Sequence, residues 1–378
     1  MEFELTADQR DLREAARKFS AKKLVEPFGG AEHHLMSVQL WRDCADFGVL
    51  GLPFPSEYGG ADADPITVFA LLEAMGEAGV APGLLFALQA HMWAVTHPVA
   101  RFGSDSQRAR WLPGLIDGSL KGAHAATEPG AGSDIAAITT TLTPDSAGYR
   151  LNGVKTFVTN APEADLFVVV ARTHGSRGHT VVVVERNHPG VSAGNRLDTI
   201  GMEAAPVGEV VFDNTPVSAN QVLGGHGRGS VVFGAAMRAE RTFISAGTVG
   251  RMRREIEMCL AHVRLRRQYG CSLADFQAVS HRVADMQVRY QAARLLGYWA
   301  AADFESAAVT SAAASIAKVY ISEAALQNGT DAVQLHGSAG YLRSGGVGQN
   351  VQAALAARIY SGTSEIQRNL IAAALGLA

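Results

Sequence analysis

The chain has 378 residues, of which 47% are hydrophobic and 18% charged, and its formal net charge is −3. That composition allows a large core and two or three structural units, and without a long run of one charge it argues against nucleic-acid binding. We expect no membrane span and no secretory signal. We also expect no metal site, since no HExxH pattern occurs. A cytoplasmic location is expected, since the three scattered cysteines form no CxxC pair.

Residues 1–118 are predicted to form a helical domain. Thr6 and Gln9 fit a capping box that opens a helix running towards Leu24. Further helices are expected over 38–47, 66–77 and 82–101, with a turn-rich break over 53–64. His91 lies in the last of these helices, where the residue pattern favours a satisfied core histidine.

The hydrophobic period changes over residues 119–226, which predicts a central β domain. Runs rich in β-branched residues at 166–171 and 180–184 and an alternating run at 208–212 indicate strands. Asn152–Gly153 predicts a hairpin turn, and Asp213–Asn214 predicts another. The glycine-rich stretch 224–229 lacks the GxGxxG spacing of a dinucleotide-binding loop, so we interpret it as a flexible link.

Residues 227–378 return to a helical pattern. Helices are expected over 231–267, 272–304 and 309–336, followed by a C-terminal pair that begins near residue 347. The predicted fold class is therefore α+β and multidomain: a helical N-terminal domain, a central β-barrel or sheet domain and a C-terminal four-helix bundle.

Glu240 is an ionisable residue on an apolar helical face. At helical spacing its neighbours include Phe233, Met237 and Ile244, none of which is charged. Burial of such a carboxylate raises its pKa towards the range of a general base. An ordinary helical glutamate paired with Arg238 or Arg241 is the alternative interpretation.

Two segments could approach a flat or anionic ligand closely. Residues 126–134 are mostly small, and residues 155–160 place an aromatic ring and a hydroxyl at a strand end. Together with later motifs they resemble the acyl-CoA dehydrogenase family along essentially the whole chain. The matching motifs are TEPGAGSD (127–134), LNGVKTFVTN (151–160), RRQYG (266–270), DFQAV (275–279), DAVQLHG (331–337) and SGTSEIQR (361–368).

This resemblance implies FAD as the cofactor, held between the β domain and the bundle. By resemblance, Thr127 and Thr159 would hydrogen-bond the flavin ring, Phe157 would flank it and Arg266 would meet the pyrophosphate. The other implied cofactor contacts are Ser133, Gln268, Tyr269, Gln334, Gly337, Ser338, Thr363 and Glu365. Some contacts cross a subunit boundary in the family, so a homodimer or homotetramer is expected.

The position of the catalytic base departs from many family members. They carry a glutamate directly before the Gly-Thr-Ser motif, where this chain has Ser361. Isovaleryl- and long-chain-type members instead place it before an arginine on the first bundle helix, which matches Glu240 here. The implied reaction is α,β-dehydrogenation of a thioester, in which Glu240 removes the α-proton and the flavin N5 accepts the β-hydride. The expected substrate contacts are Ser133, His91, Arg241, Tyr360, Ser361 and Gly362.

Substrate and acceptor stay open at this stage. The family's usual Arg-Asp pair is replaced by Gln352 and Ala353, which indicates either loss of a structural salt bridge or a reshaped substrate entrance. The acyl group could be carried by CoA or by an acyl or peptidyl carrier protein, with electron-transferring flavoprotein as the default acceptor. Because Ser361 is not a base, a flavin-dependent monooxygenase of the same fold is the alternative function.

Overall fold

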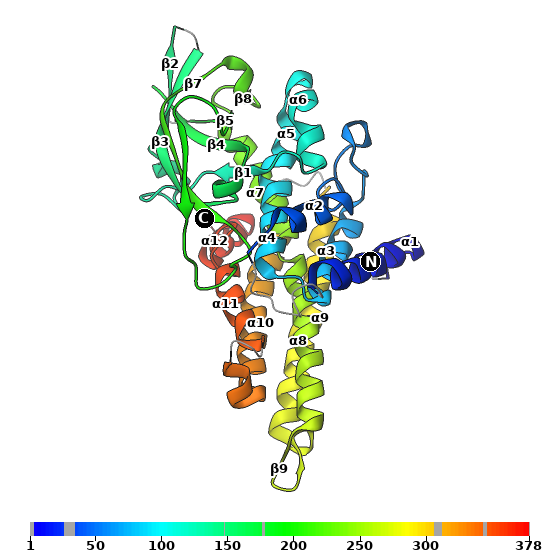
Figure 1. Cartoon of the computed structure of the whole chain (residues 1–378). Helices are drawn as coiled ribbons and strands as arrows, with labels where there is room; N and C mark the ends of the chain where they lie inside the picture. Colours follow the sequence, from blue (N-terminus) through cyan, green and yellow to red (C-terminus); the bar gives the residue numbers. More distant parts are fainter. Residues whose placement is uncertain are drawn as a thin grey trace.

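A computed structural model describes residues 4–25, 35–146, 148–175, 178–305, 312–342 and 346–377. Its three parts follow the chain order: N-terminal helices, a sheet domain and a helical bundle (Figure 1). This architecture confirms the predicted fold class. Within the described ranges, none of the helices combines the length and apolarity that a membrane span requires.

The N-terminal helices begin where the sequence supplies caps. The Thr6 side chain accepts a hydrogen bond from the Gln9 amide, and the Gln9 side chain accepts one from the Thr6 amide, so the predicted capping box is confirmed. A π-helical turn extends the first helix to Val25, and another over Met92–Thr96 interrupts the predicted helix 82–101. The helices are α1 (Ala7–Phe19), α2 (Val38–Asp46), α3 (Pro65–Ala78), α4 (Pro82–His91), α5 (His97–Phe102) and α6 (Asp105–Ile116).

The central domain is one mixed sheet with its own apolar core. Its strands pair in the order β6-β7-β3-β2-β4-β5-β8, and β1 pairs with β4 in parallel. The strands are β1 (Gly122–Ala125), β2 (Thr141–Asp145), β3 (Gly148–Thr159), β4 (Leu166–Thr173), β5 (His179–Glu185), β6 (Val191–Arg196), β7 (Val207–Val217) and β8 (Val222–Leu223).

The two predicted turns in this domain are wrong. β3 runs through Asn152–Gly153, and β7 runs through Asp213–Asn214. The pairing of β3 with β7 shifts register between Leu151 and Gly153, so the two segments face each other in a bulge, where the Asn152 side chain accepts a hydrogen bond from the Asn214 amide. Gly153 and Asn214 both have positive φ, which explains why residues typical of turns occur inside strands.

The C-terminal bundle contains one more break than predicted. The expected helix 231–267 divides near Ile244 and Ser245 into α7 (Gly229–Phe243) and α8 (Ala246–Leu265). The remaining helices are α9 (Gln277–Asp303), α10 (Ala313–His336), α11 (Val347–Ala357) and α12 (Ser364–Ala374). Residues 309–311, where the third helix was expected to begin, lie outside the described residues.

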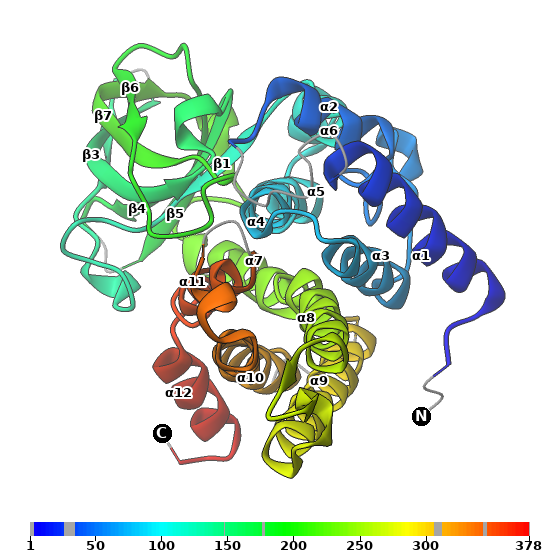
Figure 2. The same ribbon diagram turned by 60° about the horizontal axis from the view of Figure 1, so that its bottom comes forward.

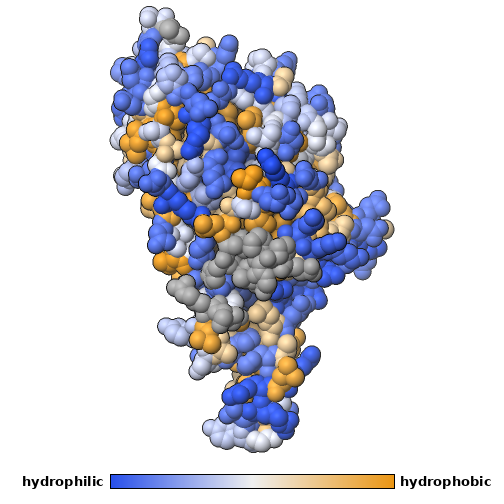
Figure 3. All heavy atoms as spheres, viewed as in Figure 1, coloured by the Kyte–Doolittle hydropathy of each residue, from blue (hydrophilic) through white to orange (hydrophobic). Residues whose placement is uncertain are grey.

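Buried polar contacts join the three parts. Glu73 on α3 accepts hydrogen bonds from Arg294 (2.7 Å) and Tyr298 (2.7 Å) on α9. Asn160, at the end of β3, donates to the Ala87 carbonyl on α4 at 3.0 Å. Figure 2 shows α4 between the sheet domain and the bundle, next to α7. On the face drawn in Figure 3, apolar residues form small separate patches within a mainly hydrophilic surface.

Candidate active site

A buried ion pair fastens the segment 126–134 to β3. Lys155 has no exposed surface, and its Nζ donates to Glu128 Oε1 at 2.9 Å and to the Ala126 carbonyl at 2.8 Å. Although burial by itself would raise the pKa of Glu128, hydrogen bonds from Thr140, Lys155 and Thr139 hold that pKa at about 2. The two sequence segments predicted to contact the cofactor are therefore fixed against each other.

The outer side of the segments 126–134 and 155–160 is open, as a cofactor site requires. We call this surface the cofactor cradle. The Thr156 amide donates to the Thr127 carbonyl at 2.9 Å, which places Thr127 beside Phe157. Phe157 is 66% exposed and has a φ of 53°, so its ring is held on the surface of the strand. A Cβ at Gly130 or Gly132 would meet no atom within 4 Å. These residues fit the flat ring and the anionic groups of FAD.

Glu240 on α7 is buried, as the sequence predicts, with 6% of its surface exposed. Burial raises the pKa of its carboxyl, while the Ser361 hydroxyl and the charges of Arg241 and Lys318 oppose that shift. Its hydrogen-bond partner is Ser361, whose Oγ donates to Glu240 Oε1 at 2.6 Å. Of the two arginines in the alternative interpretation, Arg238 donates to the Asp303 carbonyl at 3.2 Å, and Arg241 acts on Glu240 through its charge.

Lys318 on α10 is a member of this site that the sequence analysis missed. It is completely buried, and its Nζ donates to the Gly362 carbonyl at 2.8 Å. Burial lowers its pKa to about 8, and the neighbouring Arg241 acts in the same direction while Glu240 opposes it. A lone lysine in the alanine-rich stretch 312–325 is the signal that could have found it, because the same criterion identified Glu240.

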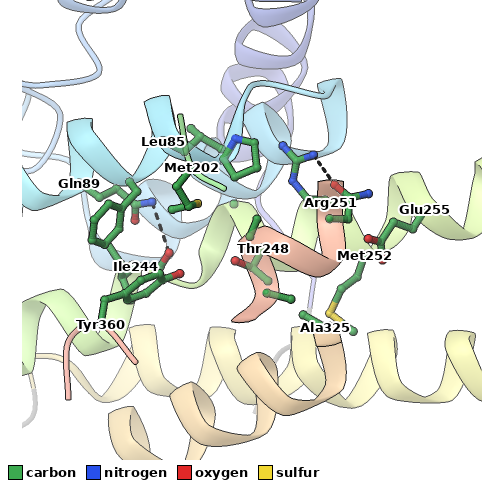
Figure 4. A pocket seen from close by; sticks show the side chains of 16 residues that line it. Leu85, Gln89, Met202, Ile244, Thr248, Arg251, Met252, Glu255, Ala325 and Tyr360 are labelled. Atoms are coloured by element: carbon green, nitrogen blue, oxygen red, sulfur yellow. Dashed lines mark hydrogen bonds between the residues drawn. The ribbon is translucent and has the colours of Figure 1, made fainter. Parts of the chain in front are cut away.

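An internal cavity lies one helical turn beyond Glu240 (Figure 4). The tilted rings of Phe86 and Tyr360, with centroids 4.5 Å apart, bound one end, and Arg251, hydrogen-bonded to Asn350 at 2.8 Å, bounds the other. Its other lining residues are Pro82, Leu85, Gln89, Met202, Ile244, Gly247, Thr248, Met252, Glu255, Ala325, Ala353 and Ala354. Ala353 therefore lies in the wall of this cavity, where the family carries an acidic residue.

His91 has a structural role in this arrangement. It is fully buried, its Nε2 contacts the Leu115 carbonyl at 2.8 Å and its Nδ1 accepts a hydrogen bond from the Gly122 amide at 3.0 Å. Burial lowers its pKa to about 4, so the ring is neutral. With both nitrogens bound to backbone it has none left for a substrate, and the expected substrate contact from His91 is corrected to a core contact.

Arg266, Gln268 and Tyr269 lie far from the cradle of their own chain. They follow α8, which extends ~30 Å at 1.5 Å per residue, and β9 (Arg267–Gln268) with β10 (Cys271–Ser272) forms the tip of that projection. Figure 1 shows this tip at the opposite end of the molecule from the β domain. Tyr269 is 96% exposed there.

Five further predicted cofactor residues lie at two helix ends of the bundle, and Thr159 ends β3. Gln334 is in the last turn of α10, and Gly337 and Ser338 follow it. Thr363 caps α12 by accepting a hydrogen bond from the Ile366 amide at 3.3 Å, and Glu365 lies in the first turn of that helix. Ser133 is exposed in the cradle segment. Among the residues that the structure describes, no group of three or more His, Cys, Asp or Glu could hold a metal ion.

Comparison with known proteins defines the class. Models of the N-terminal, middle and C-terminal domains of acyl-CoA dehydrogenases match residues 6–119, 123–215 and 227–376. The chain belongs to the acyl-CoA dehydrogenase family, as the motifs indicated, and it is an oxidoreductase acting on CH–CH bonds.

Individual known proteins are similar to this chain along nearly its whole length. An L-prolyl-(peptidyl-carrier protein) dehydrogenase from a Serratia species is 34% identical over 381 residues, which cover 100% of this chain and 99% of that protein. The solved structure of the prolyl acyl carrier protein oxidase AnaB is 36% identical, with a TM-score of 0.94 over 99% of this chain and 100% of that one. The structure of PigA with FAD and proline is 34% identical, with a TM-score of 0.96 over 100% of both chains.

Proposed function

We propose that this protein uses FAD to remove two hydrogens from Cα and Cβ of a compact acyl thioester, with Glu240 as the base. The observation that carries the proposal is a buried carboxylate with a raised pKa that accepts a hydrogen bond from Ser361. Glu240→Gln keeps the shape of the side chain and removes the base.

The cofactor is FAD, and the residues present suit it. Thr127, Phe157 and Thr159 would hold the ring, while Ser133, Gln334, Gly337, Ser338, Thr363 and Glu365 would contact the remainder. When bound, FAD supplies the acceptor for the β-hydride.

Glu240 would take the α-proton onto its carboxylate. Burial makes the ionised carboxylate a stronger base than an exposed glutamate, because its charge is poorly solvated. The Ser361 hydroxyl and the positive charges of Arg241 and Lys318 keep a usable fraction ionised. Backbone amides near the base are candidates for stabilising the negative charge that develops on the thioester oxygen, and the Glu240 amide is the first of them.

The acyl group is inferred to be small. Tyr360 directly precedes Ser361, which holds the base, and its ring packs on Phe86. Because these rings form one end of the cavity that Ile244 also lines, a long straight chain that extended into it would have to displace them. We infer a compact group such as prolyl, carried as a thioester on a carrier protein, and the relatives named for prolyl carrier-protein substrates support this choice.

The assembly and the acceptor are proposals as well. Arg266, Gln268 and Tyr269 cannot reach the cradle of their own chain from the distant tip, so a homodimer or homotetramer would bring them to a partner's FAD. Electron-transferring flavoprotein is the family's usual acceptor, whereas a relative is called an oxidase, which makes oxygen the second candidate. Oxygen as acceptor is distinct from monooxygenation, which does not require a buried base such as Glu240.

The test is an anaerobic titration of the flavin spectrum. Prolyl and straight-chain acyl groups are offered as thioesters of pantetheine, CoA and a carrier protein. We expect bleaching by the prolyl thioester, fastest from the carrier protein, and none by long straight chains. A flavin that every thioester leaves oxidised, and that is reduced only by an external reductant with oxygen uptake, would contradict the proposal.

A further inference from the structure

We propose that Ser361 is a positioning residue that orients Glu240 and sets the pH at which Glu240 works. Ser361 stands at the position where many relatives carry the base, and Lys318 and Gln367 hold Ser361 in place. This inference rests on Glu240 being the base. Its elements come from four separate parts of the bundle: α7, α10, the turn 360–363 and α12.

The hydroxyl occupies one oxygen of the carboxylate. Ser361 Oγ donates to Glu240 Oε1 at 2.6 Å, so Oε2 is left as the atom that accepts the α-proton. A hydrogen bond to a charged acceptor is stronger than one between neutral groups, and it favours the ionised form. The bond therefore fixes the direction of the base and opposes the effect of burial on its protonation.

Two buried donors fix the turn that carries the hydroxyl. Lys318 Nζ and Gln367 Nε2 each donate to the Gly362 carbonyl at 2.8 Å, and Gln367 Nε2 also reaches the Ser361 carbonyl at 3.2 Å. Lys318 and Gln367 both have no exposed surface. The Gly362 carbonyl is thus held from α10 and α12 and the Ser361 carbonyl from α12, which leaves the hydroxyl little freedom to turn away.

The backbone of Ser361 gives an independent reason to assign its side chain a role. Its φ is 56°, in the left-handed region that favours glycine. A serine at such a position is strained, and such strain persists where the surroundings demand it. A glycine would relieve the strain and lose the hydrogen bond to Glu240.

Other charged groups around Glu240 act in the same direction. Arg241 on its own helix and Lys318 on α10 both favour the ionised carboxylate. The Tyr360 hydroxyl stays neutral, because burial raises its pKa. Removal of the Ser361 hydroxyl therefore leaves the cations in place and takes away one defined donor.

The experiment follows the pH dependence of single-turnover flavin reduction by a prolyl thioester of pantetheine in holoenzyme. In Ser361→Ala we expect the acidic limb to move upward by about one to two pH units, which is the value of a hydrogen bond to a charged group. Ser361→Gly should move it equally and also raise the melting temperature. Ser364→Ala is the matched control, since Ser364 Oγ donates to Glu323 at 2.8 Å and should leave the profile unchanged.

Lys318→Met tests the support of the turn. It should move the limb in the same direction and lower the maximal rate, and Lys318→Arg should restore part of it. An infrared titration of the carboxyl band that disappears in Glu240→Gln measures the same group without turnover. Ser361→Ala and Ser361→Gly proteins with wild-type profiles and a wild-type infrared titration would overturn the inference. A shifted infrared titration with normal turnover in Glu240→Gln would show that Ser361 controls the protonation of Glu240, but it would reject Glu240 as the base and with it the catalytic role inferred for Ser361.

Discussion

Replacing Phe86 with alanine should lengthen the acyl groups that the enzyme accepts. The Phe86–Tyr360 contact forms one end of a cavity that runs along α8 from Gly247 to Arg251, about 6 Å at 1.5 Å per residue. Without the ring, methylenes of a longer chain can enter that cavity. Each buried methylene contributes about 0.8 kcal/mol, or roughly fourfold in kcat/KM, so four of them give about two hundredfold.

The Phe86→Ala change also lowers the free energy of unfolding, so control variants are needed. Phe86 is half-buried, so we expect a loss near the lower end of the range for Phe→Ala, about 3 kcal/mol. The assay is anaerobic flavin reduction with a series of straight-chain thioesters. Phe86→Leu should give a smaller extension, and Phe102→Ala, the same truncation outside the cavity lining, should give none. A folded Phe86→Ala enzyme with the wild-type chain-length profile would refute the reasoning.

Three further predictions concern the base, the cradle and the assembly. Glu240→Gln should slow flavin reduction by at least about 10²–10⁴-fold while flavin stays bound, and near-normal turnover would reject the assignment. Because folding raises the pKa of Glu240, the stability that its protonated form contributes is lost as pH rises through the folded pKa. The Glu240→Gln variant should therefore melt less pH-dependently than wild type above the unfolded pKa of 4.5. The pKa of Glu128 is lowered to about 2, so its contribution to stability is present above the unfolded value of 4.5 and is lost as pH falls towards 2. Acid should therefore release flavin, and the Lys155→Met variant should release flavin at a higher pH than wild type. Flavin fluorescence measures this release. The Arg266→Ala variant should purify with little flavin. If Arg266 serves a partner's site, mixing this variant with Glu240→Gln should restore activity in hybrid oligomers. The absence of activity in confirmed hybrids would contradict that arrangement.

The sequence predicted the order of domains because hydrophobic period changes sharply at their borders. It also predicted the burial of Glu240, since a charge among apolar neighbours at helical spacing must face the core. It could not predict Ser361 as the partner, because residues 240 and 361 meet only when α7 and the turn before α12 pack together. The burial of Lys318 was predictable by the same rule as that of Glu240.

Local turn chemistry misled the prediction inside the sheet. Asn152 and Gly153 suit a two-residue turn, but pairing with β7 along β3 outweighed that preference and placed them in a bulge. The division of the helix at Ile244 and Ser245 carried no glycine or proline signal, so it could not be read from the residues. The role of Phe86 depends on a ring contact across 274 positions of sequence, from 86 to 360, which no local pattern encodes.

The hydrogen bond between Ser361 and Glu240 has an evolutionary consequence. Side chains from positions 240 and 361 converge on one point, since their oxygens lie 2.6 Å apart. A lineage could therefore move its base from one position to the other by way of an ancestor that carried both carboxylates, which would share a single proton at that distance. Neither step would pass through an enzyme without a base, so relocation of the catalytic group within this fold requires no interval of lost activity.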